Sequence, residues 1–176
     1  MARGARDALL GLADPALLAQ CEMDRLRGSG PGGQKRNKTE SSVRLRHGAT
    51  GLSALAGESR SQHENKARAL RRLRERIAFD LREPVELDEY APPPALVLLL
   101  EQEPIRKSEK WLRSPEYLRA VGHLIDLYQA VGCSLPDASR RLAVAGGRLE
   151  RVARADDRLM RKLGELKNAQ RGRPPI

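Results

Sequence analysis

The chain has 176 residues, and its 33 Lys and Arg residues against 23 Asp and Glu residues give a formal net charge of +10. No apolar run reaches the ~18 residues of a membrane-spanning helix, no basic start precedes an apolar core of the kind that directs secretion, and an aromatic share of 3% excludes a protein built on base-stacking aromatic platforms. Two cysteines, Cys21 and Cys133, are too few for a disulfide framework or a metal quartet, so we expect a cytoplasmic chain that needs no metal and no cofactor.

The positive charge falls in two blocks separated by an acidic one. Residues 1–82 carry 17 basic and 9 acidic side chains, residues 83–110 carry 3 and 7, and residues 111–176 carry 13 and 7. Two basic blocks suit a polyanionic partner such as RNA or DNA, because each neutralised phosphate releases condensed counterions. A solvated, arginine-rich surface explains the same charge, so charge alone leaves both interpretations open.

Residues 1–83 predict a small mixed domain. Asp14 caps a short helix that has Pro15 in its first turn. A strand is expected at residues 22–28, and a glycine-rich loop follows it at residues 28–34.

Residues 42–47 alternate between apolar and basic side chains. Val43 and Leu45 share one face and arginines occupy the other, which is typical of a half-buried strand with a basic outer face. After a turn, residues 52–56 return as a second strand.

A long amphipathic helix follows these strands. Ser61 and Glu64 have the spacing of a capping box, and apolar side chains then recur every three or four residues until the chain nears Pro84. A short sheet covered by one long helix is therefore the expected architecture, and the whole chain is predicted to be of the α+β class. The apolar positions are Ala67, Leu70, Leu73, Ile77 and Leu81, and the other face carries Arg68, Arg71, Arg72 and Arg76.

The glycine-rich loop has three interpretations. Gly28, Gly30 and Gly33 match the dinucleotide-binding pattern, but no long apolar helix follows them and no acidic residue stands near position 53. A phosphate-binding P-loop would need Lys directly after Gly33, where Gln34 stands. A plain flexible turn is the second interpretation.

The third interpretation is a positioning loop. Glycines let the main chain approach a substrate closely, so Gly32 and Gly33 would bring the backbone and side-chain amides of Gln34 to a reacting centre. A glutamine amide does not titrate near neutral pH and cannot act as a general base. It can orient a water molecule and help to stabilise an oxyanion.

The segment Gly-Ser-Gly-Pro-Gly-Gly-Gln-x-x-Asn-Lys-Thr-Glu-Ser-x-Val-Arg, at residues 28–44, closely resembles the catalytic domain of class I peptide chain release factors. The segment Arg-Ser-Gln-x-x-Asn-Lys-x-x-Ala-Leu, at residues 60–70, is similar to the same family. The resemblance covers residues 14–82, and the two motifs together are far more specific than either alone.

This resemblance implies a ribosomal peptidyl-tRNA hydrolase. Gly32, Gly33 and Gln34 match the family's catalytic tripeptide, whose glutamine positions the water that cleaves the ester between peptide and tRNA. The family's glutamine is often methylated, so the expected partners are the ribosome, with its rRNA and peptidyl-tRNA, and a methyltransferase that acts on Gln34. The positions expected to brace the loop or to bind RNA are Lys35, Arg36, Asn37, Lys38, Arg60, Asn65 and Lys66.

The chain departs from the family pattern in two respects. Lys35 and Arg36 stand where many members have His-Val, and 176 residues leave no room for domains that read stop codons. Neither a Pro-x-Thr nor a Ser-Pro-Phe tripeptide occurs. The resemblance therefore points to the stand-alone members, which rescue stalled ribosomes without reading a codon. Those members often end in a basic tail, whereas residues 114–170 here predict folded structure.

Residues 84–113 predict an acidic, proline-rich linker, within which residues 96–100 form either a short buried strand or a hydrophobic tether. Residues 114–176 predict an all-helical domain with a short basic tail. Its helices are expected to begin after Ser114, after Ser134, near residue 148 and at Asp156.

The second and third of these helices resemble a helix-turn-helix module, because the apolar spacing between residues 138 and 152 fits one. Ala143 stands where many such modules have the turn glycine. Arg148, Arg151 and Arg154 are expected to project from the third helix toward phosphates. An ordinary helical bundle with a solvated arginine face is the alternative.

Two functions follow from these patterns. The first is a monomeric, codon-independent peptidyl-tRNA hydrolase that acts on stalled ribosomes. The second is a catalytically silent ribosome- or nucleic-acid-binding protein, which keeps a degenerate hydrolase domain for docking and binds through its helical block. Only the first requires hydrolysis, so a peptide-release assay separates them.

Overall fold

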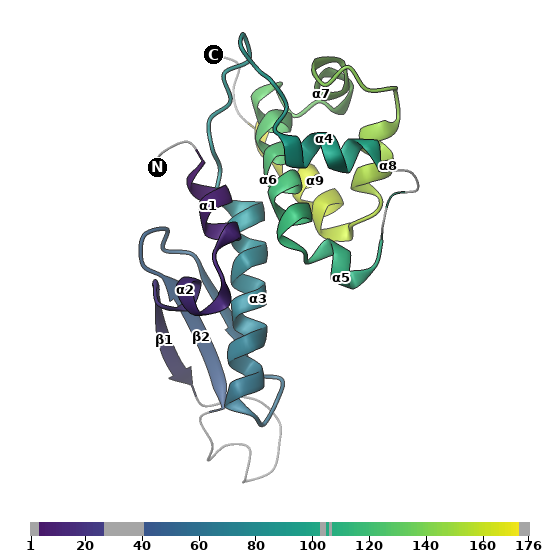
Figure 1. Cartoon of the computed structure of the whole chain (residues 1–176). Coiled ribbons are helices and arrows are strands. Elements are labelled where there is room, and N and C mark those ends of the chain that lie inside the picture. The colour runs from purple at the N-terminus through teal and green to yellow at the C-terminus, as the bar shows by residue number, and fades with distance from the viewer. Residues whose placement is uncertain (1–3, 27–40, 103–104, 106, 173–176) are drawn as a thin grey trace. The chain divides into compact units, whose positions relative to one another are not determined.

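The computed structural model describes residues 4–26, 41–102, 105 and 107–172, and Figure 1 shows their ribbon. The chain divides into a sheet unit, Ala8–Leu81, and a helical unit formed by Met1–Asp7 together with Arg82–Ile176. A small antiparallel sheet, one long helix and several shorter helices confirm the α+β class. Within the described residues, no helix has both the length and the apolar character needed to cross a membrane.

The sheet unit contains a three-stranded antiparallel sheet in the order β1-β2-β3. Strand β1 spans Cys21–Leu26, β2 spans Ser42–His47 and β3 spans Ser53–Ala56, which confirms the predicted strands to within one or two residues. Helix α3, Gln62–Asp80, covers one face of this sheet, as its apolar periodicity predicts (Figure 1).

The core of the sheet unit lies between β2 and α3. Val43 and Leu45 are fully buried, and they face the apolar stripe of the helix because side chains alternate along a strand. Ser61 is the N-cap of α3, and its hydroxyl accepts a hydrogen bond from the Glu64 N–H at 3.3 Å. The buried side of α3 comprises Ala69, Leu70, Leu73, Ile77, Ala78 and Phe79 together with Asn65.

Arginines of α3 cover the free edge of the sheet. Strand β3 is an edge strand, so some of its carbonyl groups have no strand partner. Arg72 donates to the Leu55 carbonyl at 2.6 Å and Arg76 donates to the Ser53 carbonyl at 2.8 Å. These two side chains, which were predicted to lie on a basic face, therefore satisfy carbonyl groups of the edge strand. Another chain could otherwise form hydrogen bonds with the same groups.

Two short helices precede the sheet. Helix α1, Ala5–Gly11, was not predicted, since seven residues carry too little periodicity to show a helix in the sequence. Helix α2, Asp14–Leu18, begins after Ala13, so the expectation that Asp14 is the N-cap is wrong. The Asp14 carboxylate instead accepts a hydrogen bond from Arg74 of α3 at 2.8 Å.

The helical unit packs around α6, Pro115–Ala130. Helix caps explain where its elements begin: Ser114 accepts from the Tyr117 N–H at 3.2 Å, and Ser134 accepts from the Asp137 N–H at 3.3 Å. The other helices are α4 (Pro94–Glu101), α5 (Glu109–Leu112), α7 (Leu135–Arg141), α8 (Arg148–Ala153) and α9 (Asp157–Arg171).

Asp156 joins two of these helices. Its carboxylate caps α9 by accepting from the Arg158 N–H at 2.9 Å, and it also accepts from the Tyr117 hydroxyl of α6 at 2.9 Å. Burial raises the pKa of Tyr117, with the neighbouring carboxylate acting in the same direction, so this phenol stays a hydrogen-bond donor.

The predicted linker at residues 84–113 differs from the structure. Residues 96–100 lie in helix α4 rather than in a strand or a tether, and Leu96 and Leu99 are buried where α4 packs on α6. Pro93 is the N-cap and Pro94 is the first helical residue, so these prolines begin a helix instead of interrupting one. Residues 84–113 consequently belong to the helical unit, which consists of Met1–Asp7 and Arg82–Ile176.

The segment between α7 and α8 departs from a simple helix-turn-helix. Residues 142–147 separate the two helices, which is longer than the roughly 3–4 residues of the usual turn. Ala143 has a φ of +52°, in the left-handed region where the glycine of such a turn is favoured. The chain therefore keeps the backbone conformation expected of that position without the glycine.

Candidate catalytic loop and its base

The tripeptide Gly32, Gly33 and Gln34 lies between β1 and β2. These residues fall outside the described part of the chain, and so do Lys35, Arg36, Asn37 and Lys38. The strands on either side are neighbours in the sheet, and Leu26 pairs with Ser42 where the segment leaves and rejoins them. The described residues therefore show the two paired strand ends that flank this segment, which we call its base.

Asn65 anchors this base from the first turn of α3. Its side chain is fully buried, and its amide nitrogen donates to the carbonyls of Ser41 and Ser59, each at 2.7 Å. Its side-chain oxygen accepts from the Ser59 N–H at 3.0 Å. One amide thus joins the residue that precedes β2 to the connection between β3 and α3, and both donors of its nitrogen are satisfied.

A second close contact lies beside this anchor. Ser42 is 7% exposed, and a Cβ atom on Gly57 would clash with the Ser42 Oγ. Gly57 follows Ala56, which pairs with Val43, so it lies opposite Ser42 in the register of β2 and β3. A side chain at position 57 would force the Ser42 side chain to move.

Charged side chains surround the base. Glu58 accepts a hydrogen bond from Arg72, which lowers the pKa of this exposed carboxyl group, and the Arg68 guanidinium lies 3.7 Å from Glu64. Arg60 is exposed and Lys66 is half-buried, so both side chains reach solvent near the anchored segment.

The structure distinguishes among the residues that the sequence analysis expected to brace the loop or to bind RNA. Asn65 was expected either to brace the loop or to bind RNA, and its complete burial among backbone groups leaves its side chain no surface for an RNA contact. Arg60 and Lys66 keep the exposure that an RNA contact requires. Ser42 and Gly57 were missed, although a glycine directly after an alternating strand is a signal of close backbone approach.

In the helical unit, the predicted phosphate contact of Arg148 is wrong. Arg148 is 4% exposed, and its guanidinium donates to the carbonyls of Leu100, at 2.9 Å, and Gln102 at the end of α4. It therefore does not project toward a phosphate, because the unpaired carbonyls of a helix end attract it inward. Arg151 and Arg154 are exposed, as the prediction requires.

No group of three or more His, Cys, Asp or Glu side chains that could hold a metal ion occurs within the described ranges.

Comparison with known proteins identifies the sheet unit. Residues 18–91 match the RF-1 domain family. Over 63 residues the chain is 52% identical to peptide chain release factor 1 of Leptothrix cholodnii, and this matched stretch covers 34% of this chain and 18% of that protein. Over 59 residues it is 48% identical to peptide chain release factor 2 of Paramagnetospirillum magneticum, which covers 34% and 16% respectively. Over 76 residues it is 43% identical to peptide chain release factor 1 of Erythrobacter litoralis, which covers 43% and 21%.

The chain spans about a fifth or less of the length of these curated relatives. No solved structure matches it significantly. The family match contains β1, β2, β3 and α3, with the tripeptide between the first two strands and the Asn65 anchor at its base. Residues 18–91 are therefore an RF-1 domain, a member of the family of class I release factor catalytic domains.

Proposed function

We propose that this chain is a ribosome-dependent peptidyl-tRNA ester hydrolase. The observation that carries the proposal is the tripeptide at residues 32–34 of an RF-1 domain, on a segment whose two ends enter neighbouring strands. The buried anchor at Asn65 supports it, because a loop that must deliver one amide to a reacting bond needs a fixed base.

The reaction needs no titrating side chain on the protein. Water attacks the ester carbonyl carbon, the bond between that carbon and the ribose oxygen of the tRNA breaks, and a proton from the water passes to the ribose oxygen. The side-chain amide of Gln34 orients the water, and its backbone N–H stabilises the developing oxyanion. Gly32 and Gly33 leave room for the main chain to approach the ester.

Basic side chains are assigned to RNA contact within the same proposal. Arg60 and Lys66 are accessible beside the anchored base and suit rRNA phosphates. Arg151 and Arg154 are accessible on the helical unit and suit the same chemistry. Further contacts are proposed for Lys35, Arg36, Asn37 and Lys38, with Gln34 as a methylation site and the monomer as the active form.

We propose further that hydrolysis is independent of the codon. The sequence contains neither of the tripeptides by which the family's codon-reading members are recognised, and a helical unit follows the RF-1 domain. The test is peptide release from purified ribosomes that hold a labelled peptidyl-tRNA and carry a stop codon, a sense codon or no codon in the A site. Equal release from all three supports the proposal.

Each other outcome has a distinct meaning. Release only with a stop codon contradicts codon independence but keeps the hydrolase. Ribosome binding that weakens with salt, without release from any complex, contradicts the hydrolase and favours a silent binding protein.

A further inference from the structure

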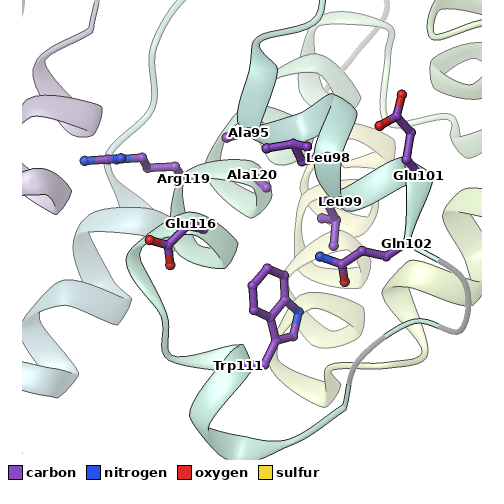
Figure 2. Close-up of a pocket in the computed structure, with 9 residues that line it drawn as sticks. All are labelled: Ala95, Leu98, Leu99, Glu101, Gln102, Trp111, Glu116, Arg119 and Ala120. Carbon is purple, nitrogen blue, oxygen red and sulfur yellow. The ribbon is translucent and has the colours of Figure 1, made fainter.

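The helical unit has an apolar groove between α4, α5 and α6. Its volume is about 530 Å³, within the range of roughly 300–1,000 Å³ typical of ligand sites. Figure 2 shows Leu99, Gln102 and Trp111 directed toward a common space, with Leu98 and Ala120 along its side. All of these residues belong to one unit, so the groove does not depend on the placement of the RF-1 domain.

Helix α4 supplies an apolar surface that the unit itself leaves uncovered. Its sequence is almost wholly apolar from Pro94 to Leu100, a composition typical of a helix buried on all sides. Leu96 and Leu99 are buried against the unit, but Leu98 is 61% exposed. A leucine so exposed, in a groove that a tryptophan also lines, has the character of an interface centre, where aromatic and aliphatic anchors concentrate.

Two carboxylates and one arginine belong to the rim of this groove, on a chain whose net charge is +10. Glu101 and Glu116 line it on opposite sides in Figure 2, whereas the Arg119 side chain points away from the Trp111 ring. Glu101 ends α4, where a negative charge is unfavourable to the helix dipole, so the helix itself gains nothing from it. The acidic rim would repel an RNA phosphate and attract a cation.

We infer that the groove between α4 and α6 binds a short, basic peptide segment of another protein, with one or two large apolar side chains in the groove and Lys or Arg against the acidic rim. The apolar surface at Leu98 and Trp111 holds the first, and Glu101 and Glu116 hold the second. This site is independent of the proposed hydrolysis, because none of its residues lies in the RF-1 domain.

The experiment selects random 12-residue peptides on the whole chain, after depletion on the variant Leu98→Ser. Peptides that combine Lys or Arg with Leu, Ile or Phe should be enriched. Trp111 is the only tryptophan in the chain, so its emission reports the binding of a synthetic, tryptophan-free copy of an enriched peptide. The emission should shift on binding, and Leu98→Ser should weaken the affinity at least tenfold.

A matched control and a charge variant complete the test. Met160 of α9 is 44% exposed in the same unit, so Met160→Ser should leave the affinity within twofold. Glu101→Lys should weaken binding and reduce its dependence on salt. The inference is overturned if no peptide is enriched over Leu98→Ser, if the enriched peptides are acidic, or if an RNA oligonucleotide shifts Trp111 emission instead. Self-association that Leu98→Ser abolishes would overturn it too, by making the groove a contact between two copies.

Discussion

Asn65 shows how much of the loop base depends on one side chain. It makes three hydrogen bonds to backbone groups of Ser41 and Ser59 from a site with no exposed surface. Asn65→Ala would leave those groups buried without partners, at a cost of about 1–3 kcal/mol for each that water cannot reach. We expect the free energy of unfolding of the sheet unit to fall by about 2–4 kcal/mol, measured by urea denaturation.

The control for this variant is Asn168→Ala. Asn168 is an exposed side chain of α9, so its removal should change the free energy of unfolding by less than about 0.5 kcal/mol. Equal destabilisation by the two variants would show that Asn65 is not the anchor. Peptide release should slow in Asn65→Ala even under conditions in which the chain remains folded.

His47 gives the sheet unit a pH dependence. The imidazole is 1% exposed at the end of β2, with its Nε2 3.1 Å from the Gln20 side-chain oxygen and its Nδ1 2.9 Å from the Thr50 hydroxyl. The Thr50 N–H donates to Nδ1, so the ring is assigned as neutral with the proton on Nε2. Burial lowers the pKa of His47 below its ordinary 6.5.

The sign of the effect follows from this direction. Below about pH 6.5, His47 binds a proton in the unfolded chain but stays neutral in the folded chain, because its pKa is lower there. The free energy of unfolding therefore falls as the pH falls toward the lowered folded pKa. We expect His47→Gln to reduce the loss of unfolding free energy between pH 7.5 and pH 5.5. The variant His63→Gln, which removes an exposed imidazole from α3, serves as the control. An unchanged slope in His47→Gln would contradict the assignment.

At the scale of elements, local signals predict most of the fold. The helix starts at Ser61, Ser114 and Ser134 could be predicted because a cap and its first turn are adjacent in the sequence. Helix α4 could not be predicted, because prolines that begin a helix look in sequence like prolines that break one. Arg148 is buried because it donates to a carbonyl group at the end of α4. Since α4 was not predicted, Arg148 was predicted to lie on the surface.

The turn between α7 and α8 carries a strain that a substitution can relieve. Ala143 has a φ of +52°, which disfavours any residue with a Cβ atom by roughly 1–2 kcal/mol relative to glycine, partly offset by the larger entropy of glycine when unfolded. Ala143→Gly should raise the free energy of unfolding of the helical unit by about 0.5 kcal/mol. Ala145→Gly, two residues along in the same segment and without positive φ, should lower it. Stabilisation by both or by neither would contradict this account.

At the scale of the whole molecule, residues at the start of the chain complete the helical unit. Arg6 is fully buried, and its guanidinium pairs with the carboxylate of Asp126, which lies 120 positions away in the sequence. Arg82 donates to the same carboxylate at 2.9 Å. Gly122 makes room for this pair, since a Cβ atom there would lie 2.5 Å from the Arg6 Nε. Such a contact between distant residues leaves no local signal in the sequence.

Removal of Arg6 should therefore destabilise a unit that lies mostly at the other end of the chain. Arg6→Ala leaves Asp126 buried with one of its two arginines, and we expect the free energy of unfolding to fall by about 3 kcal/mol in chemical denaturation. Arg161→Ala, at an exposed position of α9, should have no measurable effect. A loss of under about 1 kcal/mol in Arg6→Ala would show that the buried pair is dispensable.

The sequence predicts where the candidate site lies in the chain, but it does not predict the contacts that support the site. The tripeptide at residues 32–34 is a contiguous motif, and its family match can be recognised without coordinates. The contacts of Asn65 with Ser41 and of Gly57 with Ser42 cross between strands and helix, so they follow only from the three-dimensional packing.

The most direct test of the central claim is single-turnover peptide release from stalled ribosomes by Gln34→Ala. The variant Gln129→Ala removes an exposed glutamine of α6 and is the matched control. We expect Gln34→Ala to lose release by about 100-fold or more while it keeps its affinity for the ribosome, and we expect Gln129→Ala to release peptide like the unaltered chain. Release by Gln34→Ala at the unaltered rate would contradict the claim that this amide orders the attacking water.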